Sequence, residues 1–400
     1  MTNEETKRFI AEHAADDTAQ LLLQRHRYPD VDVAFAVQQI EGRRKAVHKL
    51  PDLAANPDFV FPPKLNLEQA SSELTADYKA RHFAEGKTVI DITGGLGIDS
   101  LYFARYAKKV VHIEQNPELF EIAKHNFKTL GLSNIECVCG NSEEVLQNLP
   151  ATADLIYADP ARRDEHNRKM VSLADCTPDI VSLLPKLFQT APQVLIKASP
   201  MLDITLAHRE LGQVAETTVV AVKNECRELL FLCRASASEP SPTTCVNILG
   251  TEKAETFVPT EIELSPKPAL APQALHYIYD PNVSVAKAGY AKAVFVRFGL
   301  AQLHPNTHLG TGDELFSDFP GRIFEVVGAT GLSAKAVRQA IPEGRANVIC
   351  RNFPQSADQL RTQMKLSDGG DVYLIATTLA KGEKIGLLCR KVDKNLSEKL

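Results

Sequence analysis

The stretch Val89-Ile-Asp-Ile-Thr-Gly-Gly-Leu-Gly-Ile-Asp99 decides the fold. An apolar run that ends in an acid predicts a buried strand, the glycines predict a sharp turn, and a helix is expected after them. Glycines let the chain turn tightly and let a ligand approach the backbone closely. The stretch therefore predicts the first strand, turn and helix of an α/β domain, with a ligand site at the turn.

The residues that follow repeat this pattern of strand, turn and helix. We expect strands at 88–92, 110–114, 135–139, 155–158 and 194–197, with helices at 99–106, 117–130, 142–149 and 177–189. Short apolar strands that alternate with helices predict a parallel, doubly wound, Rossmann-like sheet. Two further apolar runs, 217–222 and 229–233, predict an antiparallel last hairpin that closes the sheet.

Length and texture indicate several domains, because 400 residues exceed one ordinary domain. Helical spacing at 18–25, 31–47 and 67–83 predicts a helical N-terminal region. A Ser-, Pro- and Thr-rich linker is expected at 236–244, and helices at 333–341 and 357–364 with strands at 371–378 and 384–389 indicate a last small α+β unit. The expected domains are 1–84 (helical), 85–236 (Rossmann-like), 245–322 (middle) and 323–396 (C-terminal).

Composition favours a soluble cytoplasmic protein, with 44% hydrophobic and 24% charged residues and no secretory or membrane-spanning run. The eight cysteines contain no CxxC pair, which indicates reduced thiols and no metal site, and Cys137 and Cys139 are expected to be ordinary buried thiols. Residues 326–400 carry 12 Lys and Arg against 7 Asp and Glu, whereas the whole chain has a net charge of −5. A basic C-terminal unit on an acidic body suits a polyanionic partner.

Two motifs carry a family resemblance. Asp91-x-Thr-x-Gly95-x-Gly97 resembles motif I of class I S-adenosylmethionine (SAM)-dependent methyltransferases, with Thr93 in place of the first glycine. The stretch 110–117 resembles motif II, in which an acid, here Glu114, accepts both ribose hydroxyls of the cofactor. The nicotinamide-dinucleotide fingerprint fits less well, because Ser100 stands where that fingerprint has Gly or Ala.

The resemblance implies SAM as cofactor and a set of residues that bind it. Asn141 stands where the family usually has an Asp that contacts the adenine amino group, and Asn can still accept that hydrogen bond. Asp91 and Glu114 could alternatively serve only as a turn cap and a solvated strand-end acid. The expected cofactor-binding residues are Asp91, Thr93, Gly95, Gly97, Asp99, Glu114, Gln115, Asn141, Ser142 and Asp159.

Asp159-Pro160-Ala161-Arg162 resembles motif IV of methyltransferases that act on nucleic acid. In amino-methylating members the Asp and a proline carbonyl accept hydrogen bonds from the target NH₂, and an aromatic residue, which is missing here, stacks on the base. Arg162 could stack on a base or bind phosphate instead, or form a surface pair with nearby acids. The expected catalytic residues are Asp159, Pro160, Arg162 and Lys197.

A second set of residues resembles the ribose 2′-O-methyltransferases. Asp159, Lys197 and Glu228 match their Asp, Lys and Glu, and Lys79 is a candidate for the remaining Lys. Carboxylates could depress or orient Lys197, which then helps a hydroxyl lose its proton. The alternative is a strand-end ion pair between Lys197 and Glu228. The segment 68–79 could likewise cover the methionine end of SAM or act only as a packing helix.

The C-terminal part resembles a bacterial group of methyltransferases, with residues 352–378 similar to its THUMP-like domain and 281–322 to its ferredoxin-like middle domain. THUMP domains bind structured RNA, so the resemblance implies a tRNA or rRNA partner and a methyltransferase that acts on a base nitrogen or a ribose 2′-oxygen. The alternatives are a methyltransferase of a protein or small molecule, or a non-catalytic RNA-binding protein. The expected phosphate contacts are Lys335, Arg338, Arg345, Arg351, Arg361 and Lys365.

Overall fold

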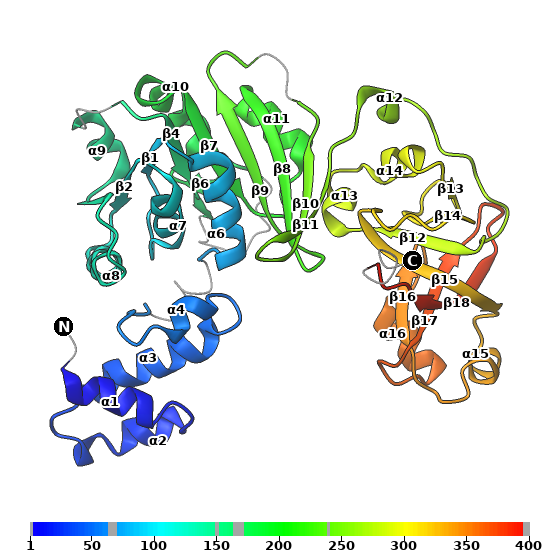
Figure 1. The fold of residues 1–400 in the computed structure, drawn as a ribbon, viewed down its shortest axis with the longest axis horizontal. Coiled ribbons are helices and arrows are strands. Elements are labelled where there is room, and N and C mark those ends of the chain that lie inside the picture. The colour runs from blue at the N-terminus through cyan, green and yellow to red at the C-terminus, as the bar shows by residue number, and fades with distance from the viewer. Residues whose placement is uncertain (1–2, 63–69, 149–151, 163–171, 238–240, 395–400) are drawn as a thin grey trace. The chain divides into compact units, whose positions relative to one another are not determined.

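The computed structural model describes residues 3–62, 70–148, 152–162, 172–237 and 241–394 (Figure 1). The chain divides into two compact units, Met1–Thr217 with Glu228–Ser241, and Thr218–Arg227 with Pro242–Leu400. Each unit is described by itself below. Within the described ranges no helix is both long and apolar enough to span a membrane.

The first unit contains the parallel sheet that the sequence predicts. The strands run in the order β3-β2-β1-β4-β7-β9, and all of these neighbours pair in parallel except β7 and β9, which are antiparallel. This confirms the doubly wound fold. The elements are β1 (Thr88–Asp91), α7 (Ile98–Tyr106), β2 (Lys109–Glu114), α8 (Pro117–Thr129), β3 (Ile135–Cys139), α9 (Ser142–Asn148), β4 (Leu155–Ala158), β5 (Ala161–Arg162), β6 (Cys176–Thr177), α10 (Ile180–Thr190), β7 (Gln193–Ala198), α11 (Ile204–Leu211), β8 (Val214–Val222) and β9 (Glu225–Arg234).

Helices precede this sheet, as expected for residues 1–84. Phe9, Leu21 and Ile40 belong to a small apolar cluster of their own, to which α1, α2 and α3 contribute. The helix expected at 67–83 is observed from residue 73 onward, and residues 63–69 lie outside the described ranges. The elements are α1 (Glu4–Glu12), α2 (Thr18–Leu23), η1 (Arg25–Arg27), α3 (Val33–Ala46), α4 (Pro51–Ala55), α6 (Glu73–Lys79) and η2 (Ala80–Ala84).

The hairpin of β8 and β9 is present, but it does not close the sheet. The turn consists of Lys223 and Asn224 alone, both with positive φ (49° and 65°), as a two-residue hairpin turn requires. Beyond it, β10 (Thr244–Gly250) pairs in parallel with β8, and β11 (Lys253–Phe257) pairs with β10. These two strands, which the sequence places in the middle domain, extend the first sheet to nine strands.

The second unit has its own seven-stranded sheet, in the order β13-β14-β12-β15-β18-β17-β16. The long strand β15 pairs with β12 on one side and β18 on the other, so the domain boundary expected at 322/323 falls inside a strand. The elements are α12 (Glu261–Leu264), β12 (Tyr277–Pro281), α13 (Val283–Lys287), α14 (Ala291–Arg297), β13 (Ala301–Gln302), β14 (Gly310–Gly312), β15 (Gly321–Thr330), α15 (Ala334–Ala340), β16 (Asn347–Arg351), α16 (Ala357–Met364), β17 (Val372–Thr378) and β18 (Lys384–Lys391).

One expectation about the cysteines is wrong. Cys139 is exposed and Cys137 is only partly buried. Both lie on β3, which is the edge strand of the nine-stranded sheet, so one of its sides has no neighbouring strand to cover it. Alternation of apolar residues predicts the strand but does not distinguish an edge from a centre.

Candidate functional site

The glycine-rich turn after β1 has two packed glycines, Gly94 and Gly97, and one open glycine, Gly95. Gly97 has φ +82° and precedes α7, and a Cβ added to it would lie 2.4 Å from the Cζ of Phe127. Gly95 also has a positive φ (+54°), but the nearest atom to an added Cβ is the Thr93 carbonyl oxygen at 3.8 Å. Gly97 therefore lets the turn pack against α8, whereas the backbone at Gly95 remains accessible to a ligand.

Asp91, at the end of β1, holds this turn together. One carboxylate oxygen accepts a hydrogen bond from the Ser100 hydroxyl (2.6 Å), and the other accepts from the Thr93 backbone N–H (3.0 Å). The Ser100 oxygen also lies 3.0 Å from Nδ1 of the buried His112. Burial raises the pKa of Asp91 to about 7. Its contacts therefore organise the turn from within the protein.

This pKa leads to a testable pH dependence. Because the folded state holds the proton of Asp91 up to about pH 7 whereas an unfolded Asp releases it near pH 3.8, stability falls as the pH rises through that window. We expect Asp91→Asn, which is neutral at every pH, to remove part of this decline. Urea unfolding of both proteins at pH 5 and pH 8 measures the effect, and an equally steep decline in the variant would contradict it.

Glu114, at the end of β2, is oriented by the turn. Its carboxylate accepts hydrogen bonds from the backbone N–H of Gly95 (2.6 Å) and of Asn116 (2.7 Å), one on each oxygen. A carboxylate oxygen has two acceptor positions, so each oxygen can still accept one hydroxyl. This geometry fits a ribose with two neighbouring hydroxyls beside the open backbone at Gly95.

The other expected cofactor residues lie nearby on the chain but have differing surroundings. Gln115 and Asn141 are exposed. The Asn141 side chain accepts a hydrogen bond from the Glu143 backbone N–H (2.9 Å) where α9 begins, and Ser142 is the first residue of that helix. The side-chain oxygen of Asn141 therefore already accepts one hydrogen bond, and its side-chain nitrogen is not used in that bond.

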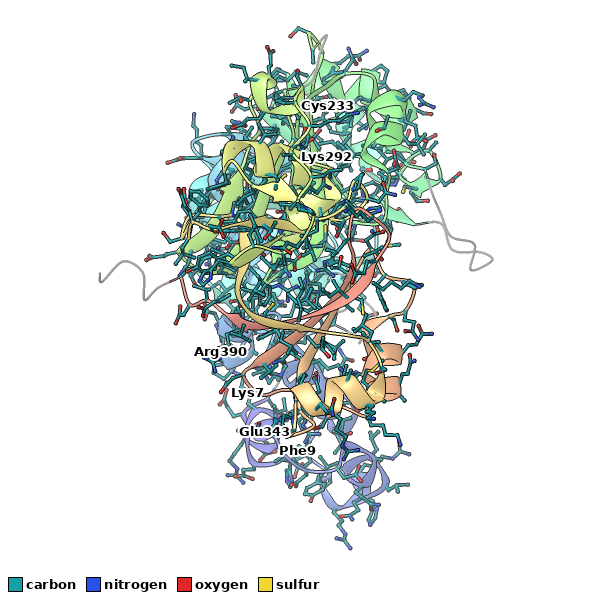
Figure 2. The ribbon with its side chains drawn as sticks, turned by 90° about the vertical axis from the view of Figure 1, so that its right-hand side faces the viewer. Lys7, Phe9, Cys233, Lys292, Glu343 and Arg390 are labelled. Carbon is teal, nitrogen blue, oxygen red and sulfur yellow. The ribbon has the colours of Figure 1, made fainter. Side chains whose placement is uncertain are left out.

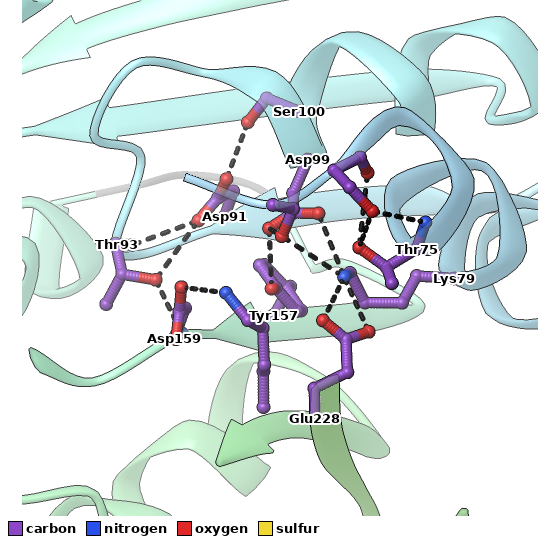
Figure 3. A network of polar contacts seen from close by, with 12 residues as sticks. Thr75, Lys79, Asp91, Thr93, Asp99, Ser100, Tyr157, Asp159 and Glu228 are labelled. Carbon is purple, nitrogen blue, oxygen red and sulfur yellow. Dashed lines mark hydrogen bonds and ion pairs between the residues drawn. The ribbon is translucent and has the colours of Figure 1, made fainter. Parts of the chain in front are cut away.

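A fully buried lysine lies at the centre of the site (Figure 3). The Lys79 Nζ is 2.8 Å and 3.0 Å from the two carboxylate oxygens of Glu228 and 3.2 Å from Oδ1 of Asp99. Asp99 also accepts hydrogen bonds from the Tyr157 hydroxyl and the Ser71 hydroxyl, each 2.8 Å long. Asp99, expected to bind the cofactor, is therefore engaged by protein groups.

The pKa values of the two acids of this cluster shift in opposite directions. Burial raises the pKa of Glu228, and the opposing charge of Lys79 does not fully offset it. Burial would also raise the pKa of Asp99, but Lys79 and Lys197 together hold it below its usual value. Asp99 is thus the carboxylate that the cluster keeps ionised.

Asp159 and Lys197 form the more accessible pair of the site. The Lys197 Nζ donates to Asp159 Oδ2 at 2.5 Å, and the two side chains are 12% and 34% exposed. The Asp159 backbone N–H donates to the Thr93 hydroxyl (2.7 Å), which ties the motif at the end of β4 to the turn after β1. The pair therefore lies beside the open part of the turn.

The alternative of an ion pair between Lys197 and Glu228 is wrong, because Glu228 pairs with Lys79 and Lys197 pairs with Asp159. Burial alone would lower the pKa of Lys197, but the charges of Asp159, Asp99 and Glu228 raise it above its ordinary value. Of the two effects expected of the carboxylates, depressing or orienting Lys197, this direction favours an ammonium that Asp159 orients.

The structure thus holds these residues in two groups, Lys79 with Asp99 and Glu228 (Figure 3), and Lys197 with Asp159. The charge of Lys197 acts on both acids of the first group. Pro160 is buried, and Arg162 lies in β5, but the contacts expected for its side chain fall outside the described part of the chain. Tyr157 is a site residue that the sequence does not predict. The signal was its hydroxyl group, which lies in an otherwise apolar strand and donates to Asp99. Among the described residues, no three His, Cys, Asp or Glu side chains are placed to hold a metal ion.

Comparisons with family models match three parts of the chain. Residues 321–391 match the THUMP domain-like family, 277–320 match a ferredoxin-like domain, and 76–176 match the family described as conserved hypothetical protein 95. The first two models lie on the seven-stranded sheet, and the third covers β1, β2, β3 and β4 of the nine-stranded sheet with the glycine-rich turn and Asp159.

Whole-chain similarity is also found. A crystal structure of a candidate methyltransferase from Porphyromonas gingivalis W83 is 34% identical, with a TM-score of 0.86, and the match covers 97% of this chain and 98% of that one. Uncharacterised SAM-dependent methyltransferases of two Mycobacterium tuberculosis strains, CDC 1551 and H37Rv, are 27% identical over 347 residues, 85% of this chain and 91% of theirs. An uncharacterised RNA methyltransferase of Clostridium acetobutylicum is 30% identical over 121 residues, 30% of this chain and 26% of that protein.

These matches agree with the geometry of the site. The coverage of the Porphyromonas protein extends over both sheets, and the Mycobacterium proteins share most of the chain. The acid at the end of β2 and the open glycine beside it fit the cofactor that the names of the Mycobacterium proteins state. The chain therefore belongs to a family of SAM-dependent methyltransferases that carry a ferredoxin-like and a THUMP-like part after the transferase domain.

Proposed function

We propose that the protein transfers a methyl group from SAM to structured RNA. The observation that carries the proposal is the Asp159–Lys197 pair, a partly exposed acid and cation held beside the open turn. The match to the THUMP domain-like family, the relative named as an RNA methyltransferase and the basic surplus of residues 326–400 support RNA as the substrate. In this proposal residues 85–236 form the transferase domain, and residues 245–396 hold the substrate.

Methyl transfer from SAM requires mainly that the protein position the reacting groups and stabilise charge. When bound, SAM supplies a methyl group on a positively charged sulfur that leaves as a neutral thioether. Glu114 accepts the ribose hydroxyls, and Thr93 fixes the backbone of Asp159 next to the turn. Lys197 holds one oxygen of Asp159, so the other can accept a hydrogen bond from the attacking group and orient its lone pair.

Two acceptor atoms fit this arrangement. The assembly of Lys79, Asp159, Lys197 and Glu228 favours a ribose 2′-oxygen, because the Lys197 ammonium can stabilise negative charge that develops there. The Asp159-Pro160 motif favours a base amino nitrogen, whose N–H can donate to Asp159. In either case the bond from methyl to sulfur breaks, a bond from methyl to oxygen or nitrogen forms, and the acceptor releases one proton.

Transfer of radiolabelled methyl from SAM to total RNA tests the proposal. The RNA is taken from a strain that lacks the gene, so that its target sites are unmodified. We expect label in RNA with the wild-type protein and none with Asp159→Ala, while calorimetry shows that both bind SAM. Alkaline hydrolysis then distinguishes the acceptors, because a 2′-O-methylated linkage resists it.

Either acceptor result supports RNA methylation, whereas absence of label would reject it. If no RNA fraction is labelled although the protein binds SAM, the substrate is a protein or small molecule, or the protein binds without catalysis. Persistent labelling with Asp159→Ala would remove Asp159 from the transfer step.

A further inference from the structure

A second cluster of charged groups lies in the C-terminal unit, whose side chains Figure 2 shows with Lys292 and Arg390 labelled. Asp280 on β12 is only 2% exposed, and two arginines contact it. The Arg322 Nη2 lies 2.5 Å from Asp280 Oδ2, while the Arg351 Nε and Nη2 lie 3.1 Å and 3.2 Å from Oδ1 and Oδ2. Arg322 comes from β15 and Arg351 from the end of β16.

The three side chains lie at one end of an apolar core. Asp280 and Arg322 are direct partners in the β12–β15 register. Their face of the sheet also carries Ile278 and Phe324, which pack in one cluster with Ile349 of β16, two residues before Arg351. The sheet therefore places the end of its edge strand β16 near β12. Asp280, Arg322 and Arg351 form a charged rim at this end of the core.

The charges of this rim do not cancel. One buried carboxylate faces two guanidinium groups, and a single arginine would suffice to neutralise it. Arg322 and Arg351 keep 30% and 37% of their side chains exposed, so part of each fork faces solvent. Burial lowers the pKa of His308, and the positive charges of Arg351 and Lys292 lower it further against the opposing charge of Asp280. The net positive charge of Arg322 and Arg351 with Asp280 favours the binding of an anion.

Two buried hydrogen-bonding groups on this face of the sheet have no partner among the described residues. The buried Nε of Arg322 has no hydrogen-bond partner among the described residues. Thr377 is fully buried, and its hydroxyl likewise lacks a partner within that part of the chain. Thr377 is the register partner of Arg351 on the neighbouring strand β17, so both side chains project from the same face. Both atoms are shielded from solvent, so a ligand on the surface would contact the exposed parts of the two arginines and not these atoms.

We propose that Arg322 and Arg351 form a binding site for a phosphate group of the RNA backbone, with Asp280 positioning the two arginines. Guanidinium forks match phosphate oxygens with two hydrogen bonds each. The inference rests on the RNA substrate proposed above. It assigns a substrate contact of the C-terminal unit to these two residues.

Binding of a labelled tRNA transcript to the full-length protein tests the site. We expect Arg351→Gln to weaken binding about tenfold near 0.1 M salt and to make the salt dependence shallower by roughly one counterion. Thr377→Val keeps the side-chain shape and removes only a buried hydroxyl on the same face of the sheet. It should leave RNA binding unchanged, which separates the exposed arginines from the buried part of this face.

Arg390→Gln is the matched control, because Arg390 lies on β18 of the same sheet and projects from the opposite face. It should change binding less than twofold. Should Arg351→Gln fail to fold, Arg351→Lys keeps a cation beside Asp280 without the two-pronged fork, and intermediate affinity is expected. Wild-type affinity in Arg351→Gln, with RNA still methylated, would overturn this site alone. A wild-type protein that binds no RNA would overturn both this site and the proposed substrate.

Discussion

Replacement of Lys79 by Met is expected to lower the free energy of unfolding by about 3–5 kcal/mol, because removal of one partner of a buried ion pair leaves an uncompensated charge. Lys79 is fully buried, and it is the cation that contacts both Glu228 and Asp99. Met has a similar length and no polar atom, so the loss arises from the stranded carboxylates and not from a cavity. Urea unfolding of the full chain at pH 8 measures the difference.

The pH dependence separates this cause from a packing defect. Burial already raises the pKa of Glu228, and loss of Lys79 raises it further. Since a raised carboxyl pKa makes stability fall as the pH rises, the destabilisation by Lys79→Met should be smaller at pH 5 than at pH 8. Lys108→Met, which changes an exposed lysine, is the control and should shift stability by less than about 0.5 kcal/mol. Equal changes in the free energy of unfolding for the two substitutions would show that the buried ion pairs of Lys79 do not stabilise the protein.

The sequence predicts the first sheet well because local and global signals agree there. The apolar strand before Asp91, the glycines and the following helix each have one compatible local structure, and β1, β3 and β4 occur where expected. Sheet membership is harder to predict. The strands at 244–257 have ordinary strand texture, and nothing in their sequence states that they pair with β8 instead of β12. Such pairing depends on contacts far apart in the chain.

The same limit applies to the site. Glu228 is expected at the start of the last strand, and only the family resemblance groups it with Lys79, because no spacing rule connects residues 149 positions apart. Asp99 matches the motif by position, yet a lysine and two hydroxyl groups use its carboxylate. Motif spacing therefore predicts which residues gather at the strand ends. It does not predict which of them face the ligand and which face one another.

Replacement of Lys197 by Met is expected to reduce the rate of methyl transfer by about 10²–10³-fold, as loss of one preorganised donor at a reacting centre commonly does. Lys197 binds Asp159 and remains an ammonium, because the surrounding carboxylates raise its pKa. Without it Asp159 loses its orientation, and charge that develops on the acceptor atom loses its nearest cation. Single-turnover transfer to RNA at saturating SAM measures the chemical step.

Separate measurements of SAM binding and of the methyl-transfer rate distinguish this role of Lys197 from a purely structural one. Glu114 and the turn at Gly95, which are expected to bind the cofactor, do not contact Lys197, so the Kd for SAM should stay within about twofold while the rate falls. Lys197→Arg keeps a cation that can hold Asp159, and partial rescue is expected. Lys186→Met removes an exposed lysine of α10 and should have no effect. Unchanged turnover of Lys197→Met with SAM bound would exclude Lys197 from the transfer step and leave Asp159 to act alone.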